Sequence, residues 1–361
     1  MVHIPAREIP VPTSVSREAQ AVLAMGRLGP PPKELPALDD TDGWKSYVAE
    51  TDGFVRSMVG DATAGFAGSI EERDIGPCPL YVVTPEDIAD NDARVFLDIH
   101  GGAWVLGGGD LCKMTTIVLA NAIGVRAWSV DYRMPPDYPF PTPLDDCVAA
   151  YRLLLDERNP SEIIVGGTSA GGNLAAALIL RARDEGMPLP AAVVFNTGAF
   201  DLTGSGDSWL INDGLDNVLS GPVEPCTQLY AGSYDRREPY ISPLFGDLTG
   251  FPPVILLTGT RDRLLSDNVR MHRALRAAGV EADLHVWEAA GHGGFLGMAP
   301  EDAERFAELR RFVEARCGSI TTYLGDSFGA TKPPKPRRMR TARCVTRIGS
   351  ESSFPHRSWQ P

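Results

Sequence analysis

The sequence predicts an α/β protein in which a mostly parallel β-sheet carries helices on both faces. From about residue 95 onward, short β-branched apolar runs alternate with stretches of helical periodicity. Such alternation is typical of βαβ units, whose parallel strands are buried by helices. A glycine-rich turn, Gly166–Gly172, also joins one of these strands directly to a helix.

Residues 1–60 precede this alternation and are interrupted by prolines. Ser16–Arg27 is predicted to be a short helix with Ser16 as its cap. A loosely helical apolar series comes next and either packs on the domain or covers a pocket: Trp44, Tyr47, Phe54 and Met58. Gly76-Pro77 is typical of a turn, so a strand pair is expected around it, at 70–75 and 80–84.

The remaining strands are predicted at 95–99, 125–130, 163–165, 192–195, 254–257 and 284–287. The helices between them are predicted at 111–122, 144–157, 170–184, 267–278 and 300–315. Nearly sixty residues separate Phe195 from Val254, and an insertion of that size is usually functional, often a lid. We therefore expect an N-terminal cap segment (1–60), a main domain (61–317) with an insertion at about 200–245, and a basic, disordered tail (318–361).

The charge of the chain is unevenly distributed. The net charge is −13 over 361 residues, although the eight Lys and Arg and two acidic residues of 318–361 give that tail +6. The rest is therefore strongly acidic, which argues against a nucleic-acid or anionic-membrane surface.

No signal peptide or membrane span is visible, so a soluble cytoplasmic protein is expected. The six cysteines form no C-x-x-C pair and lie at no short spacing from a histidine, which makes a zinc site or dense disulfides unexpected.

The turn around Ser169 carries the strongest chemical signal. Gly167 and Gly171, two residues to either side, remove side chains that would collide at a sharp strand-to-helix bend. The serine would stand clear of the backbone, beside the free N–H groups and positive end of the helix after it. Acyl transfer needs this combination of nucleophile and oxyanion donors. A glycine-rich turn that binds phosphate, or simply turns, is the alternative interpretation.

Ser327 lies in a second G-x-S-x-G pattern, Gly325–Gly329. The residues after it, Thr331–Pro336, cannot form the required helix because three of them are prolines. We interpret Ser327 as a chance match.

A serine nucleophile needs a base, and His292 is the best placed of the six histidines. It follows the last predicted strand on a glycine-rich loop, whereas His272 and His285 lie within regular elements. Asp262 follows the strand at 254–257 and could orient the imidazole; Asp267 is the local competitor but resembles a helix-cap or first-turn residue. The backbone N–H groups of Gly101, Gly102 and Ala170 could hold an oxyanion.

Four stretches together resemble the hormone-sensitive-lipase-like branch of the α/β-hydrolases, the bacterial type IV esterases. They are His100–Trp104, Gly167–Ala175, Asp131–Pro141 and the pair Asp262 and His292. The resemblance runs from about Leu80 to Cys317. It implies a carboxylesterase that cleaves short-to-medium acyl esters through an acyl-enzyme, with no metal or organic cofactor. It also implies a cap built from the N-terminal segment and the insertion, and often a homodimer.

The sequence departs from this family at four places. Met134-Pro135 replaces the usual Leu-Ala, and Thr168 replaces the commoner Asp before the nucleophile, as in the GTSAGG subgroup. Asp98 puts a carboxylate into an apolar strand, where we assign it no role, and the tail matches nothing in the family.

Two other function classes on the same fold remain open. Some relatives are non-catalytic receptors that lost the catalytic histidine, and others are lyases; cleavage of lactones, amides or carbonates would use the same residues. The presence of His292 and Ser169 favours ester cleavage. If His292 is the base, activity should decline on acidification near the ordinary histidine pKa of about 6.5.

Overall fold

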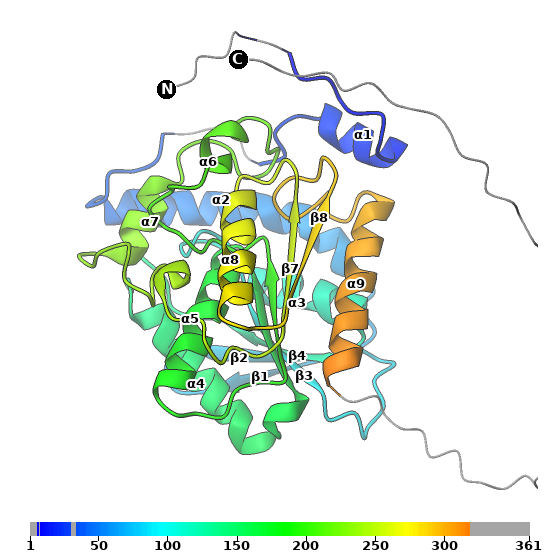
Figure 1. Cartoon of the computed structure of the whole chain (residues 1–361), viewed down its shortest axis with the longest axis vertical. Helices are drawn as coiled ribbons and strands as arrows, with labels where there is room; N and C mark the ends of the chain where they lie inside the picture. Colours follow the sequence, from blue (N-terminus) through cyan, green and yellow to red (C-terminus); the bar gives the residue numbers. More distant parts are fainter. Residues whose placement is uncertain (1–5, 7, 30–33, 318–361) are drawn as a thin grey trace, which may run out of the picture. The chain divides into compact units, whose positions relative to one another are not determined.

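The central feature is one β-sheet, shown in Figure 1. The computed structural model describes residue 6 and residues 8–29 and 34–317. Within these residues, eight strands form the sheet in the order β1-β2-β4-β3-β5-β6-β7-β8. They are β1 (Ser69–Asp74), β2 (Pro79–Thr84), β3 (Val95–Ile99), β4 (Arg126–Val130), β5 (Ile163–Thr168), β6 (Ala192–Asn196), β7 (Val254–Gly259) and β8 (Ala282–Trp287). β2 is antiparallel to β1 and β4, and all other neighbours are parallel. The predicted mostly parallel sheet is confirmed.

Two sets of helices bury the two faces of the sheet. One face packs on α3 (Asp110–Ile123) and α9 (Pro300–Arg316). The other packs on α4 (Thr142–Glu157), α5 (Ala170–Asp184) and α8 (Leu265–Ala277). Successive residues of β3 show the alternation: Phe96 belongs to the first core and Leu97 to the second.

The strand β5 extends three residues beyond the sequence-based prediction, through Gly166 and Gly167 to Thr168. Glycine is usually unfavourable in strands, so the prediction ended at Val165. Here the glycines are required by close packing. A Cβ on Gly166 would lie 2.5 Å from the Phe96 ring and 2.8 Å from Cβ of Val194, on the two neighbouring strands.

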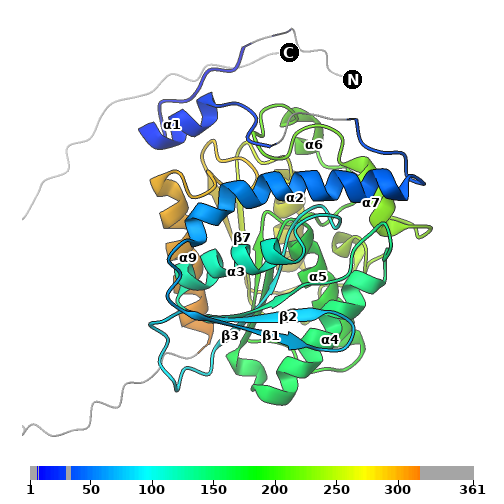
Figure 2. The ribbon, with the colours of Figure 1, turned by 180° about the vertical axis from the view of Figure 1, so that it is seen from behind.

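The N-terminal segment forms two helices, α1 (Arg17–Ala24) and α2 (Thr41–Thr63). Ser16 caps α1 as predicted, because its hydroxyl accepts a hydrogen bond from the N–H of Ala19 at 3.0 Å. The loose apolar series of the sequence becomes the 23-residue α2, which packs on α3 and lies beside it in Figure 2.

The insertion between β6 and β7 contains α6 (Ser208–Ile211), α7 (Glu224–Ala231) and the 3₁₀ turn η2 (Pro243–Phe245); another 3₁₀ turn, η1 (Pro160–Glu162), precedes β5. Residues 318–361, which include Ser327, lie outside the described residues. The disorder expected for this tail therefore stays a prediction.

Candidate active site

Ser169 occupies a strained turn between β5 and α5. Its backbone has φ 59° and ψ −118°, a conformation that is rare for a residue with a side chain. The flanking glycines make this turn feasible. A Cβ on Gly167 would lie 2.4 Å from the carbonyl carbon of Gly171, and a Cβ on Gly171 would lie 1.8 Å from the carbonyl oxygen of Ile99. Both positions therefore exclude every side chain, as the sequence motif indicated.

Three backbone N–H groups near Ser169 are free to donate. Those of Gly101, Gly102 and Ala170 make no hydrogen bond to any other described residue. Ala170 is the first residue of α5, where helix geometry leaves the N–H unpaired. Gly101 lies against the nucleophile turn, since a Cβ there would be 2.9 Å from the Thr168 carbonyl oxygen and 3.3 Å from Cβ of Ser169. This arrangement suits an oxyanion held between the two segments.

His292 and Asp262 are in contact in the folded chain. His292 Nδ1 lies 3.1 Å from Asp262 Oδ1, and both side chains are buried. The Asp262 carboxylate also accepts hydrogen bonds from Thr258 Oγ1 at 2.7 Å and from the N–H of Leu264 at 2.9 Å. Within the described chain no hydrogen bond joins the hydroxyl of Ser169 to the His292 ring. Catalytic hydrogen bonds are often long before substrate binds.

Asp267, the competitor of Asp262, is placed differently. It lies in the first turn of α8 but is fully buried and caps nothing there. Its carboxylate instead accepts from the N–H groups of Phe200 and Asp201 at 2.8 and 2.9 Å and from the Trp209 indole at 3.0 Å. Asp267 therefore anchors the insertion to the sheet domain.

Asp216 is a component of the site that sequence reasoning missed. It comes from the insertion and is buried beside the histidine loop. Its Oδ1 accepts from the N–H of His292 at 3.2 Å, and its Oδ2 accepts from the N–H of Arg263 at 2.8 Å. A lone aspartate in a long insertion carries no local signal of this role.

Arg305 of α9 connects the histidine loop to the nucleophile turn, and it was also missed. This buried guanidinium donates to the carbonyl oxygen of Gly293 and to Oδ1 of Asn196, each at 2.6 Å. The Asn196 amide in turn donates to Thr168 Oγ1 at 3.1 Å. One continuous chain of hydrogen bonds thus joins the residue after His292 to the residue before Ser169.

The surroundings of His292 change its pKa. Burial favours the neutral ring, but the negative charges of Asp262 and Asp216 outweigh burial, so the pKa of His292 is raised above 6.5. The pKa of His292 therefore lies above the ordinary histidine value that was expected from the sequence.

This shift gives a testable pH dependence. A base must be neutral to accept a proton, so kcat/KM for an ester should decline as the pH falls through a value above 6.5. Asp216→Asn removes one of the charges and should move this midpoint to lower pH. The check is a pH–rate profile of both proteins. A wild-type midpoint at or below 6.5, or no displacement in the variant, would contradict the assignment.

The chain is similar to known esterases. A profile of the α/β-hydrolase-fold family matches residues 96–296. The acetyl-hydrolase of Streptomyces hygroscopicus is 34% identical over 258 residues, 70% of this chain and 83% of its own. Carboxylesterase NlhH of Mycobacterium tuberculosis is 32% identical over 272 residues, 68% of this chain and 83% of its own.

Solved structures agree with these relatives. A crystallised esterase, E25, has a TM-score of 0.81 and 35% identity, covering 88% of this chain and 99% of its own. An esterase of the bacterial hormone-sensitive lipase family has a TM-score of 0.74 and 32% identity, covering 85% and 100%.

The fold and these relatives define a carboxylic ester hydrolase. The chain belongs to the α/β-hydrolase family, in its hormone-sensitive-lipase-like branch, and the resemblance seen in the sequence is confirmed. None of the helices in residues 8–29 and 34–317 is long and apolar enough to cross a membrane.

Proposed function

We propose that Ser169, His292 and Asp262 form the catalytic triad of this carboxylesterase. Ser169 Oγ attacks the ester carbonyl while His292 Nε2 accepts its proton, and Asp262 holds the ring through Nδ1. The N–H groups of Gly101, Gly102 and Ala170 stabilise the oxyanion. His292 then protonates the leaving alcohol, and water repeats the sequence on the acyl-enzyme. The observation that carries this proposal is the buried contact between His292 and Asp262 at 3.1 Å.

An apolar pocket beside the nucleophile turn fits the acyl chain. It has a volume of about 520 Å³ and begins at Gly167, Thr168 and Gly293, next to Ser169 and His292. It continues between α2, α3 and α9, where its walls include Phe54, Met58, Val118, Leu119, Phe306 and Leu309. A mostly apolar pocket of this size holds a small or medium ligand. It supports short-to-medium acyl esters as substrates.

Asp98 of β3 also reaches this pocket. Its carboxyl accepts a hydrogen bond from Thr116 Oγ1 at 2.6 Å. Burial raises the pKa of Asp98 to about 6. Below about pH 6 the Asp98 carboxyl is mostly neutral. It then repels an anionic substrate less than an ionised carboxylate in the pocket wall would.

The test is hydrolysis of p-nitrophenyl esters from acetate to palmitate. We expect kcat/KM to peak between butyrate and octanoate, because a pocket of about 520 Å³ accommodates a chain of this size. Val118→Phe narrows the pocket and should lower kcat/KM for octanoate about tenfold relative to acetate. The matched control is Val269→Phe, on the partly exposed face of α8, which should leave the profile unchanged.

Two outcomes would contradict this assignment. A maximum at palmitate, or an unchanged profile in Val118→Phe, would place the acyl chain elsewhere. No turnover on any ester would favour a receptor or lyase on the same fold.

Four further expectations from the sequence are also part of this proposal: the GTSAGG subgroup, a homodimer, a cytoplasmic location and the division into cap and main domain.

A further inference from the structure

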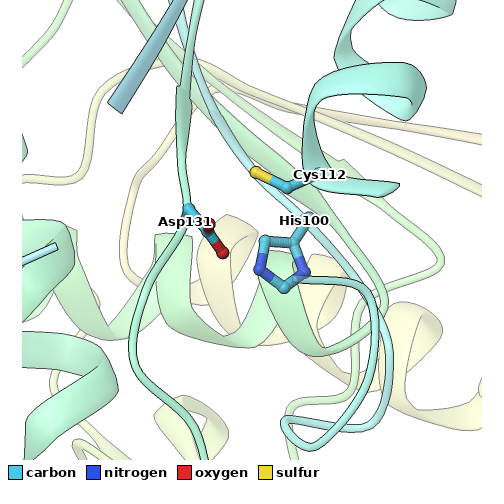
Figure 3. A group of neighbouring side chains, drawn as sticks. All are labelled: His100, Cys112 and Asp131. Atoms are coloured by element: carbon cyan, nitrogen blue, oxygen red, sulfur yellow. The ribbon is translucent and has the colours of Figure 1, made fainter. Parts of the chain in front are cut away.

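Three side chains with different metal-binding atoms converge next to the loop that contains Gly101 and Gly102, as Figure 3 shows. His100, Cys112 and Asp131 each offer one ligand atom, and these atoms all lie within 4.8 Å of one another. The sheet brings two of them together: Ile99 of β3 pairs with Val130 of β4, so the next residues, His100 and Asp131, leave the sheet side by side. Cys112 comes from the first turn of α3.

The His100 ring is oriented as a metal ligand requires. Its Nδ1 lies 2.7 Å from the carbonyl oxygen of Gly101, to which it must donate, and this leaves a lone pair on Nε2. The side chain is only 4% exposed, and Nε2 is buried without a hydrogen-bond partner among the described residues. Burial lowers the pKa of His100, so the ring is neutral at pH 7. Buried polar atoms rarely lack partners, and a missing ion is one explanation.

Cys112 and Asp131 are held by neighbours that would support ligation. Ser129 Oγ lies 2.8 Å from the buried Cys112 sulfur and can donate to a thiolate. The Asp131 carboxylate accepts from the N–H of Gly109 at 2.9 Å and from the Tyr81 hydroxyl at 3.3 Å. Outer partners of this kind fix ligand geometry in protein metal sites.

We propose that His100 Nε2, Cys112 Sγ and the Asp131 carboxylate bind one divalent transition-metal ion of the Zn²⁺ type. Nitrogen, thiolate and carboxylate are the ligands that Zn²⁺ accepts, with water as the fourth. The two anionic ligands neutralise the ion. Asp131 also lines a surface groove of about 480 Å³, so an ion that arrives from solvent would meet this carboxylate first.

Binding has two consequences for the molecule. Zinc–ligand bonds of 2.0–2.3 Å place tetrahedral ligand atoms about 3.3–3.8 Å apart. Ligand atoms at the 4.8 Å limit of this cluster must therefore move at least about 1 Å closer. The His100 ring would then shift the Gly101 peptide that it holds. The Cys112 thiol, whose pKa burial raises, must release its proton to solvent, so binding should weaken as the pH falls.

The first experiment is a titration of the whole protein with Co²⁺, monitored by near-ultraviolet absorption. One equivalent should produce a thiolate-to-cobalt charge-transfer band, and Zn²⁺ should abolish the band by displacement. Cys112→Ser should lack the band and keep its thermal midpoint within a few degrees. The matched control Cys226→Ser, at a buried thiol of α7, should retain the band. No band, or an equal band in Cys112→Ser, overturns the proposal and leaves an ordered water as the occupant.

A second readout separates this site from the triad. Asp216, Asp262 and His292 also form a cluster that could hold a metal, but it contains no thiol. If the proposed oxyanion role of Gly101 is right, Zn²⁺ should lower kcat reversibly in the wild type and several-fold less in Cys112→Ser. Equal inhibition of both would assign the inhibition to the triad. Because the cobalt band needs no turnover, failure of the proposed triad and failure of the metal site remain distinguishable.

Discussion

Ser169→Ala is expected to lower kcat for ester hydrolysis by about 10⁴- to 10⁶-fold. The hydroxyl is the nucleophile that attacks the ester in the proposed mechanism, and Ser169 holds it on a sharp turn with φ 59°. Alanine fits the same turn without new contacts, so the fold should remain intact. The measurement is steady-state hydrolysis of p-nitrophenyl butyrate, with thermal melting to confirm folding.

Ser327→Ala is the matched control, because Ser327 has the same G-x-S-x-G neighbours in sequence but is followed by three prolines within nine residues. It should retain full activity. An exchange of the two results would show that the strand-to-helix turn is not the site.

Asp262→Asn is expected to lower kcat by about 10⁴-fold with little change in KM. An amide at this position can donate to His292 Nδ1, which would favour the tautomer that carries its proton on Nε2 and cannot accept one from Ser169. The rates of acyl-enzyme formation and of acyl-enzyme hydrolysis should both fall by a similar factor. Single-turnover and steady-state kinetics on one ester provide the check.

Asp267→Asn, five residues away on α8, tests the competing assignment. Its amide nitrogen would face one of three donors that now bind the carboxylate, so we expect a loss of about 1–3 kcal/mol in the free energy of unfolding. Its kcat should stay within a few-fold of the wild type. A larger kcat loss in Asp267→Asn than in Asp262→Asn would reverse the roles of the two residues.

The sequence allowed the sheet, its order of elements and the candidate triad to be predicted because these depend on local patterns. Strand periodicity placed Asp262 and His292 after β7 and β8, at the edge where parallel strands end. Glycine spacing around Ser169 indicated the sharp turn. Each of these signals lies within a few residues of the feature that it predicts.

The parts that escaped prediction depend on contacts between distant segments. Asp216 contacts the N–H of His292 across 76 residues of sequence, and Arg305 bonds Asn196 across 109. No local spacing encodes such pairs. The same holds for the cluster of His100, Cys112 and Asp131, whose members meet because β3 pairs with β4 and α3 packs beside them.

The contacts of α1 have a consequence for how caps can be exchanged between relatives. The backbone N–H and hydroxyl of Ser16 both bind Glu301 of α9 at 2.8 Å. The apolar face of α1 packs on Ala290 and Phe295, on either side of His292. If the N-terminal segment were replaced by that of another esterase, the histidine loop would lose the support of α1. Any effect of the exchange on substrate choice would then be mixed with this loss of support. Chimeras designed to alter substrate range should keep residues 15–28 with the body of the enzyme and exchange only the helix α2.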